Sequence, residues 1–139
     1  MPYPEMLVSP MRAELTNNGF TEMLDANAVA NTMESAKGTT LLVVNSVCGC
    51  AAGAARPGIL KSLNHDKKPS NLLTVFAGQD LDAVAKAREY MVPFPPSSPA
   101  IALFKDGELV HMLERHLIEG RTADMIAANL AAAYEEYCA

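Results

Sequence analysis

Two cysteines one residue apart, Cys48 and Cys50, directly follow an apolar run at residues 39–47. Thiols this close, where a strand ends and a helix can begin, indicate redox chemistry rather than packing. The unpaired N–H groups and the positive end of a helix lower the pKa of a nearby thiol. We expect Cys48 at or just before the first turn, with its sulfur accepting backbone N–H groups. Cys50, two residues further in, is better placed to attack a mixed disulfide formed at Cys48.

Gly49 separates the two thiols. We expect this glycine to remove Cβ crowding and to permit the unusual dihedrals of a very small ring. A disulfide between residues i and i+2 should be strained, because bridged cysteines want a Cα separation of roughly 4.4–6.8 Å and a dihedral near 90°. Strain makes such a bond easier to reduce, which favours an oxidising, isomerising or thiol-exchanging role.

A soft-metal-binding module is the alternative interpretation of the pair. In it, Cys48 and Cys50 hold zinc, copper or iron, together with Cys138 or with the pair of a second subunit. Third and fourth ligands at suitable spacing are missing from the sequence, so we favour the redox interpretation.

The segments around the motif alternate between strands and helices. Helices are predicted over residues 10–18, 26–37, 51–64 and 81–91, with a last one capped by Thr122, and strands over residues 20–24, 40–47, 72–76, 100–105 and 108–115. This order predicts an α/β fold, in which a mostly parallel sheet carries helices on both faces and a closing hairpin adds an antiparallel edge. We expect a single domain over residues 1–139.

Prolines and aspartates mark several boundaries. Ser9 and Pro10 form a typical helix start, and Asp25 and Asp80 are predicted helix caps. Pro57 lies well inside the predicted helix 51–64 and should kink or restart it. Four prolines at residues 93–99 exclude both helix and central strand there, so this segment is predicted to be a stiff loop.

Composition excludes several function classes. A formal net charge of −5 argues against a nucleic-acid partner, and the only basic doublet, Lys67 and Lys68, is too short to bind a phosphate backbone. Neither a charged leader nor an apolar stretch of about 20 residues is evident, so we expect a cytoplasmic protein without a membrane segment. Three cysteines fit no closed disulfide framework, and in a reducing compartment a close pair is more often catalytic or metal-binding.

Three polar residues near the motif have two interpretations each. Asn45 and Ser46 end the strand and could hydrogen-bond near the thiols. Their positions are equally compatible with capping the next helix or stabilising a turn. Arg56 could raise the acidity of the thiols or hold a substrate carboxylate. A solvated position on the helix surface is the more common role, and we adopt it.

The third cysteine and the histidines receive no catalytic role. Cys138 lies one residue from the end of the sequence, where a frayed, uncommitted thiol is expected. The histidines, His65, His111 and His116, show no ligand spacing among themselves.

Residues 41–50, LLVVNSVCGC, and 51–58, AAGAARPG, resemble the bacilliredoxin family of thioredoxin-fold proteins. That family carries Cys-Gly-Cys where thioredoxin carries Cys-Gly-Pro-Cys. The N-terminal segment PMRAEL at 10–15, with Gly19 and Phe20, also resembles the family. The segment SPAIALFKDGELV at 98–110 is similar to the cis-proline strand and hairpin of thioredoxin-fold proteins generally.

The resemblance implies a thioredoxin-like three-layer fold with an added N-terminal helix. It implies that Cys48 attacks, that Cys50 resolves, and that Pro99 is cis, with the Ser98 backbone beside the thiols to pair with an extended substrate. Gly49 belongs to the same substrate-binding set. The implied activity is removal of a low-molecular-weight thiol, such as bacillithiol, from mixed disulfides on other proteins, with weak disulfide isomerase activity. Neither a metal nor an organic cofactor is required by this reaction, and the oligomeric state is left open.

Overall fold

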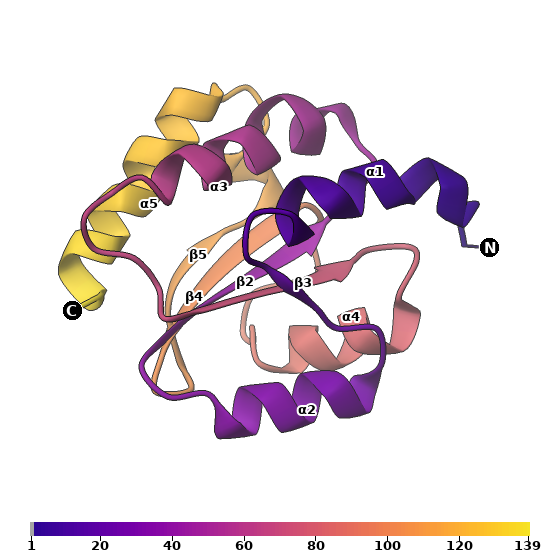
Figure 1. The fold of residues 1–139 in the computed structure, drawn as a ribbon, viewed down its shortest axis with the longest axis horizontal. Coiled ribbons are helices and arrows are strands. Elements are labelled where there is room, and N and C mark those ends of the chain that lie inside the picture. The colour runs from indigo at the N-terminus through magenta and orange to yellow at the C-terminus, as the bar shows by residue number, and fades with distance from the viewer. Residues whose placement is uncertain (1) are drawn as a thin grey trace.

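A five-stranded sheet between two layers of helices forms the protein in the computed structural model, which describes residues 2–139 (Figure 1). In chain order the elements are α1 (Glu5–Thr16), β1 (Thr21–Glu22), α2 (Ala26–Ser35), β2 (Thr39–Asn45), the π-helical η1 (Ala51–Ala55), α3 (Arg56–Ser62), β3 (Asn71–Phe76), α4 (Leu81–Glu89), β4 (Ala100–Lys105), β5 (Glu108–Leu113), the 3₁₀ helix η2 (Arg115–Leu117) and α5 (Ala123–Tyr137).

The strands lie in the order β1-β3-β2-β4-β5. β1 and β2 run parallel to β3, whereas β4 runs antiparallel to β2 and β5 antiparallel to β4. The central strand β2 is buried along its whole length, as expected of an apolar strand covered on both faces. This arrangement confirms the predicted α/β fold, with a parallel centre and an antiparallel C-terminal hairpin.

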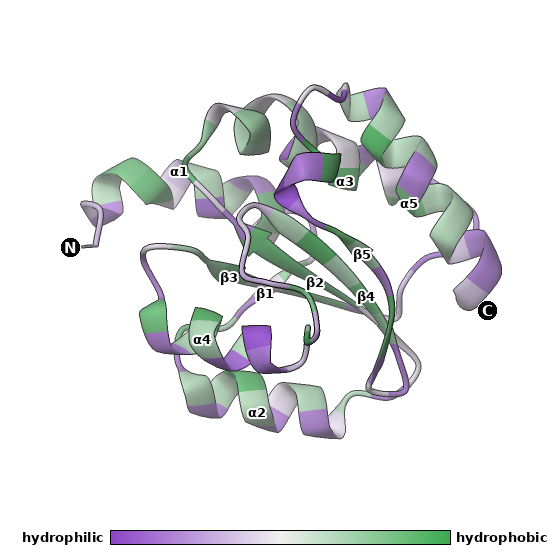
Figure 2. Cartoon of the chain, turned by 180° about the vertical axis from the view of Figure 1, so that it is seen from behind, coloured by the Kyte–Doolittle hydropathy of each residue, from purple (hydrophilic) through white to green (hydrophobic). Residues whose placement is uncertain are grey.

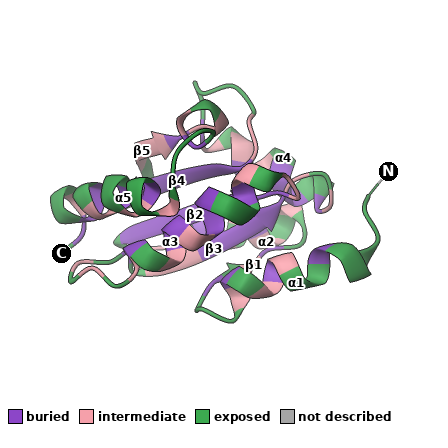
Figure 3. Ribbon diagram, turned by 90° about the horizontal axis from the view of Figure 1, so that it is seen from above, coloured by how far each residue is buried: buried purple, intermediate pink, exposed green. Residues whose placement is uncertain are grey.

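Side chains of β2 alternate between two cores. Leu41 and Val43 pack with residues of α1, α3 and α5, while Leu42 and Val44 pack with residues of α2 and α4. The apolar colour of the strands and of the helix surfaces turned toward them follows this division in Figure 2. Figure 3 shows the central strands β2 and β4 as buried, with helices that carry both buried and exposed residues around them.

The first helix begins earlier than predicted. α1 starts at Glu5, with Pro4 at its N-cap, and Pro10 lies inside the helix rather than in its first turn. A proline there costs a backbone hydrogen bond, but the buried face formed by Val8, Arg12 and Leu15 holds the helix against the rest of the molecule. The predicted first strand shrinks to the two residues of β1.

Asp80 precedes α4 as predicted, but its side chain makes no capping hydrogen bond. Its carboxylate instead accepts from both terminal nitrogens of the buried Arg12, at 2.9 and 2.7 Å. Arg12 also contacts Glu22 at 3.0 Å and Glu5 at 2.8 Å. Asp80 is therefore an ion-pair partner of Arg12 instead of a helix cap. Through Asp80 and Glu22, Arg12 links α1 to the start of α4 and to β1.

The other two predicted caps are confirmed. Asp25 accepts from the backbone N–H of Ala28, and Thr122 from that of Met125. None of the helices within residues 2–139 is long and apolar enough to cross a membrane.

Candidate active site

The motif of two cysteines lies just beyond the carboxyl end of β2. The Cys48 carbonyl accepts hydrogen bonds from the N–H groups of Ala51, at 3.1 Å, and Ala52, at 3.3 Å, so the helical segment opens at Cys48. The π-helical turn η1 then leads into α3, where Pro57 occupies the first turn. Proline lacks the N–H that would continue an α-helical ladder, so the predicted interruption at Pro57 is confirmed.

The two thiols are free, half-buried and adjacent, with their sulfurs 2.6 Å apart. Burial opposes ionisation of Cys48, but hydrogen bonds from the Cys50 thiol, the Ala51 N–H, the Ser46 hydroxyl and the Cys50 N–H outweigh it. The pKa of Cys48 is therefore lowered. The pKa of Cys50 is raised by burial and then by its contact with Cys48. The site thus contains one thiol prepared to ionise and one that holds its proton longer.

Arg56 lies beneath the motif rather than on the helix surface. Its side chain is only 2% exposed, so the expectation of a solvated arginine is wrong. Nη1 donates to Asn45 Oδ1 at 2.9 Å and to the Ser46 carbonyl at 2.8 Å. Nε lies 3.1 Å from Glu14 Oε2, in an ion pair without hydrogen-bond geometry. The signal in the sequence was the pair Asn45 and Ser46 at the end of an apolar strand, because buried polar residues need a polar partner.

Hydrogen bonds through Asn45 and Ser46 connect this arginine to the backbone of Cys48. Asn45 donates to the Met11 carbonyl at 3.1 Å and accepts from the Ser46 N–H at 2.8 Å. The Ser46 hydroxyl accepts from the Cys48 N–H at 3.2 Å. Asn45 and Ser46 therefore act near the thiols, and the pairing with Arg56 explains why both can be buried.

The loop before β4 lies beside the motif. Val44 pairs with Ala100, so continuing the antiparallel register by one residue sets Pro99 opposite Asn45. The peptide bond between Ser98 and Pro99 is cis, as predicted; the one between Val92 and Pro93 is also cis, which was not predicted. Pro99 is buried, whereas Ser98 is half-buried.

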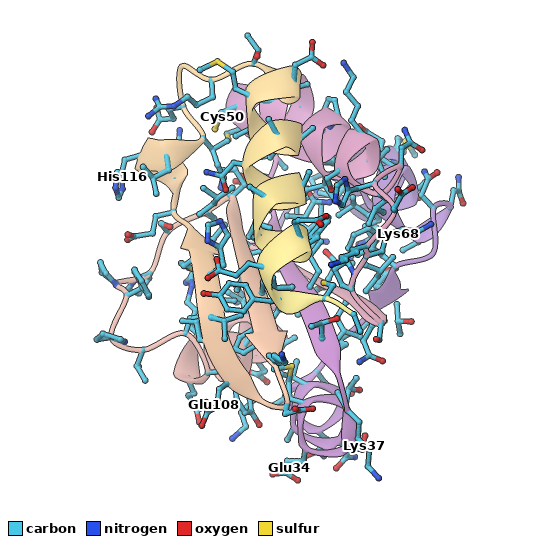
Figure 4. All side chains as sticks on the ribbon, turned by 90° about the vertical axis from the view of Figure 1, so that its left-hand side faces the viewer. Glu34, Lys37, Cys50, Lys68, Glu108 and His116 are labelled. Carbon is cyan, nitrogen blue, oxygen red and sulfur yellow. The ribbon has the colours of Figure 1, made fainter. Side chains whose placement is uncertain are left out.

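Arg115 is a residue of the site that sequence reasoning missed. Its backbone N–H donates to Ser97 Oγ at 3.2 Å, and its Nη1 donates to the Ser98 carbonyl, also at 3.2 Å. The sheet topology explains the placement. Because β4 is antiparallel to β2 and β5 to β4, the end of β5 returns to the edge where the thiols lie. Figure 4 shows His116, the next residue, at the same end of the molecule as Cys50.

Gly49 has an unstrained backbone while the two thiols are free. It is exposed, it does not have a positive φ, and a Cβ added to it would meet nothing within 4 Å. The expected absence of crowding and the unusual dihedrals concern the disulfide ring, and because both cysteines are free here, they stay predictions for the oxidised form. The exposed backbone of Gly49, between the two cysteines, has open space beside its Cα.

Cys138 is not a frayed thiol, because it is buried in the core formed with α3 and α5. It lines a cavity together with Thr39 and Lys105, at the amino end of β2 and thus at the opposite end of the strand from Cys48. Two of the histidines have other partners: His65 contacts Glu135, and His111 contacts Asn129. Within residues 2–139, no three His, Cys, Asp or Glu side chains are grouped in a way that could hold a metal ion.

Comparisons with known proteins agree with this geometry. A family described as disulphide isomerase matches residues 3–138. A bacilliredoxin of Cytophaga hutchinsonii is 63% identical, over 96% of this chain and 98% of that protein. One from Halalkalibacterium halodurans is 57% identical, over 98% of this chain and 94% of that protein. Among solved structures, oxidised mitochondrial thioredoxin 3 of Saccharomyces cerevisiae matches with a TM-score of 0.57 at 15% identity, over 88% of this chain and 98% of that one.

The bacilliredoxin relatives, the thioredoxin fold and the paired thiols at the end of the central strand together support a thiol-disulfide redox role, so the protein is an oxidoreductase. The fold likeness covers the helices and the sheet, while the relatives in sequence cover almost the entire chain. This chain belongs to the bacilliredoxin family.

Proposed function

We propose that this protein removes a low-molecular-weight thiol, such as bacillithiol, from mixed disulfides on other proteins. The observation that carries the proposal is the division between the two adjacent thiols, since the pKa of Cys48 is lowered and that of Cys50 is raised. A nucleophile needs the thiolate form, and a resolving thiol needs only to be near. The proposed setting is the reducing cytoplasm.

The first step is an exchange at Cys48. Its thiolate attacks the small-molecule sulfur of the mixed disulfide, forms a new S–S bond to that sulfur, and releases the client protein's cysteine as a thiolate that takes up a proton. The exposed backbone at Gly49 leaves room for a bulky client at this point.

The second step involves Cys50. Its thiol loses a proton, attacks Cys48 Sγ and displaces the small thiol, which leaves a disulfide between the two cysteines. Two further equivalents of a low-molecular-weight thiol reduce that disulfide and become oxidised to their own disulfide. A second route uses Cys48 alone, with a free small thiol attacking the adduct in place of Cys50. The same exchanges, applied to a client with several cysteines, would give weak disulfide isomerase activity.

We assign substrate contacts to Ser98, Pro99 and Gly49. Ser98 and Pro99 lie on the loop that faces the end of β2, and their backbone could pair with an extended client segment. The Ser98 carbonyl already accepts from Arg115, but a carbonyl oxygen has two lone pairs and can accept once more.

Intact mass spectrometry after mixing the protein with a bacillithiol-modified client tests the proposal. Cys50→Ser should retain a bacillithiol adduct on Cys48, whereas the unchanged protein should release the thiol and show a loss of two hydrogens. Cys48→Ser should form no adduct and should leave the client modified. If both variants clear the client as fast as the unchanged protein does, the assignment is wrong.

A further inference from the structure

Arg115 brings a positive charge to the two thiols. Its pKa is raised by its hydrogen bond to Glu119 and then by the charges of Cys48 and Cys50. Burial and Cys48 raise the pKa of Cys50, and the charge of Arg115 acts in the opposite direction. The hydrogen bond from Nη1 to the Ser98 carbonyl, at 3.2 Å, holds the guanidinium at the loop that faces the end of β2, the end of the strand from which the two thiols follow.

The position of this side chain is held by both neighbouring segments. Nη1 donates to the Ser98 carbonyl at 3.2 Å and Nε to Glu119 Oε1 at 2.9 Å, while the backbone N–H of Arg115 donates to Ser97 Oγ. A side chain held in advance loses little conformational freedom when a ligand binds, so its contacts contribute more of their energy to affinity.

Arg115 retains unused hydrogen-bonding capacity. A guanidinium has five N–H donors, and two of them have partners within residues 2–139, which leaves one on Nη1 and both on Nη2. The side chain is 43% exposed, so these donors are accessible from solvent. The Nη1 and Nη2 edge of a guanidinium matches the two oxygens of a carboxylate.

We propose that Arg115 is a specificity-determining residue that binds a carboxylate of the low-molecular-weight thiol while its sulfur is attached to Cys48. This inference rests on the proposed function and adds a chemical class to it: the preferred thiol carries a carboxylate. Glu119 opposes the contact, because its own carboxylate occupies Nε and repels an approaching anion.

The experiment compares two client proteins that carry either bacillithiol or the ester of bacillithiol, in which the carboxylates are masked. For each enzyme form, kcat/KM is measured on both clients, and their ratio reports preference for the charged thiol. Changes in the acidity of Cys48 or Cys50 affect both clients equally and cancel in this ratio. The variants are Arg115→Gln and Glu119→Gln. The matched control is Arg121→Gln, which removes an exposed arginine whose side chain makes one hydrogen bond within residues 2–139, to the Glu119 carbonyl at 3.5 Å.

Arg115→Gln should lower the ratio roughly three- to tenfold, as expected for a half-exposed contact between a guanidinium and a carboxylate. Glu119→Gln should raise the ratio, Arg121→Gln should leave it within about twofold, and high salt should bring the unchanged protein toward the Arg115→Gln value. Equal losses on both clients in Arg115→Gln would overturn the inference, because Arg115 would then act on the thiolates alone. Failure of the unchanged protein on both clients would overturn the proposed function and this inference with it.

Discussion

Replacement of Arg56 by methionine would test the buried hydrogen-bond chain under the redox motif. Methionine is unbranched and apolar, so it fills the space while removing two hydrogen bonds from a charged donor, at 2.9 and 2.8 Å. Such bonds contribute about 1.5–3 kcal/mol each, and burial of the methionine side chain returns about 1.5–3 kcal/mol. Asn45 Oδ1 retains the Ser46 N–H, but the Ser46 carbonyl loses its guanidinium partner. We expect Arg56→Met to lower the free energy of unfolding by about 2–3 kcal/mol.

Chemical denaturation measures this loss, and the pH dependence of alkylation reports its effect on the site. Ser46 lowers the pKa of Cys48 and is itself held by Arg56, so the variant should show a higher Cys48 pKa than the unchanged protein. A domain of this size has about 5–15 kcal/mol of stability and should stay folded during the titration.

The matched control is Glu14→Gln, which removes only the partner of a half-exposed ion pair with Arg56. Because Arg56 keeps its hydrogen bonds to Asn45 and Ser46 in this variant, Glu14→Gln should cost less stability than Arg56→Met and should leave the titration of Cys48 unchanged. Unaltered stability in Arg56→Met would refute the reasoning about the fold. Reduced stability with an unmoved Cys48 titration would refute the link between this network and the reactive thiol.

Three further predictions concern packing, pH and thiol accessibility. A Cβ on Gly58 would lie 2.6 Å from Ile126, so Gly58→Ala should destabilise the protein by about 1–3 kcal/mol in denaturant melts, whereas Gly53→Ala, where a Cβ meets open space, should be neutral or stabilising. Burial raises the pKa of Tyr134 from its ordinary value of 10 to about 12. The neutral phenol therefore contributes its full stabilisation below pH 10, and this stabilisation is lost as the pH rises through 12. Between these two pH values the free energy of unfolding of the unchanged protein should fall by about 2–3 kcal/mol more than that of Tyr134→Phe. The same pH dependence of unfolding in both proteins would contradict this prediction. Cys138 is 5% exposed and should resist alkylation in the native protein under conditions that modify Cys48 within minutes; equal labelling in a mass-spectrometric time course would show that the C-terminal end opens.

Much of the fold could be predicted from local sequence signals, because those signals act over a few residues. The apolar strand before Cys48 and the caps at Asp25 and Thr122 depend on neighbours in the chain, and the structure agrees with each. Asp80 was assigned wrongly because its partner, Arg12, lies 68 residues away in the sequence. A local cap and a distant ion pair compete for the same carboxylate, and sequence position alone does not show which one prevails.

The site could be predicted only where its residues are adjacent in the chain. The spacing of Cys48 and Cys50 is enough to predict the redox pair. The burial of Arg56, by contrast, depends on how the turn at η1 directs the following helix under the end of β2. The pairing of β4 with β5 brings Arg115 to the Ser98 carbonyl, on the loop beside the thiols. A sequence pattern predicts this hairpin but does not show which strand lies next to it. A topology drawn from the predicted hairpin would have indicated that the end of its second strand lies at the thiol edge.

The helix α1 has a consequence for any attempt to shorten this protein. It packs against the face of the sheet that α3 and α5 also cover, and it supplies the Met11 carbonyl to Asn45 and the Glu14 carboxylate to Arg56. This helix therefore supports the polar network beneath the reactive sulfur. A trimmed scaffold beginning at β1 would keep both cysteines and all the longer strands, yet it would leave a buried cation without its counter-ion and a strand-end amide without its acceptor.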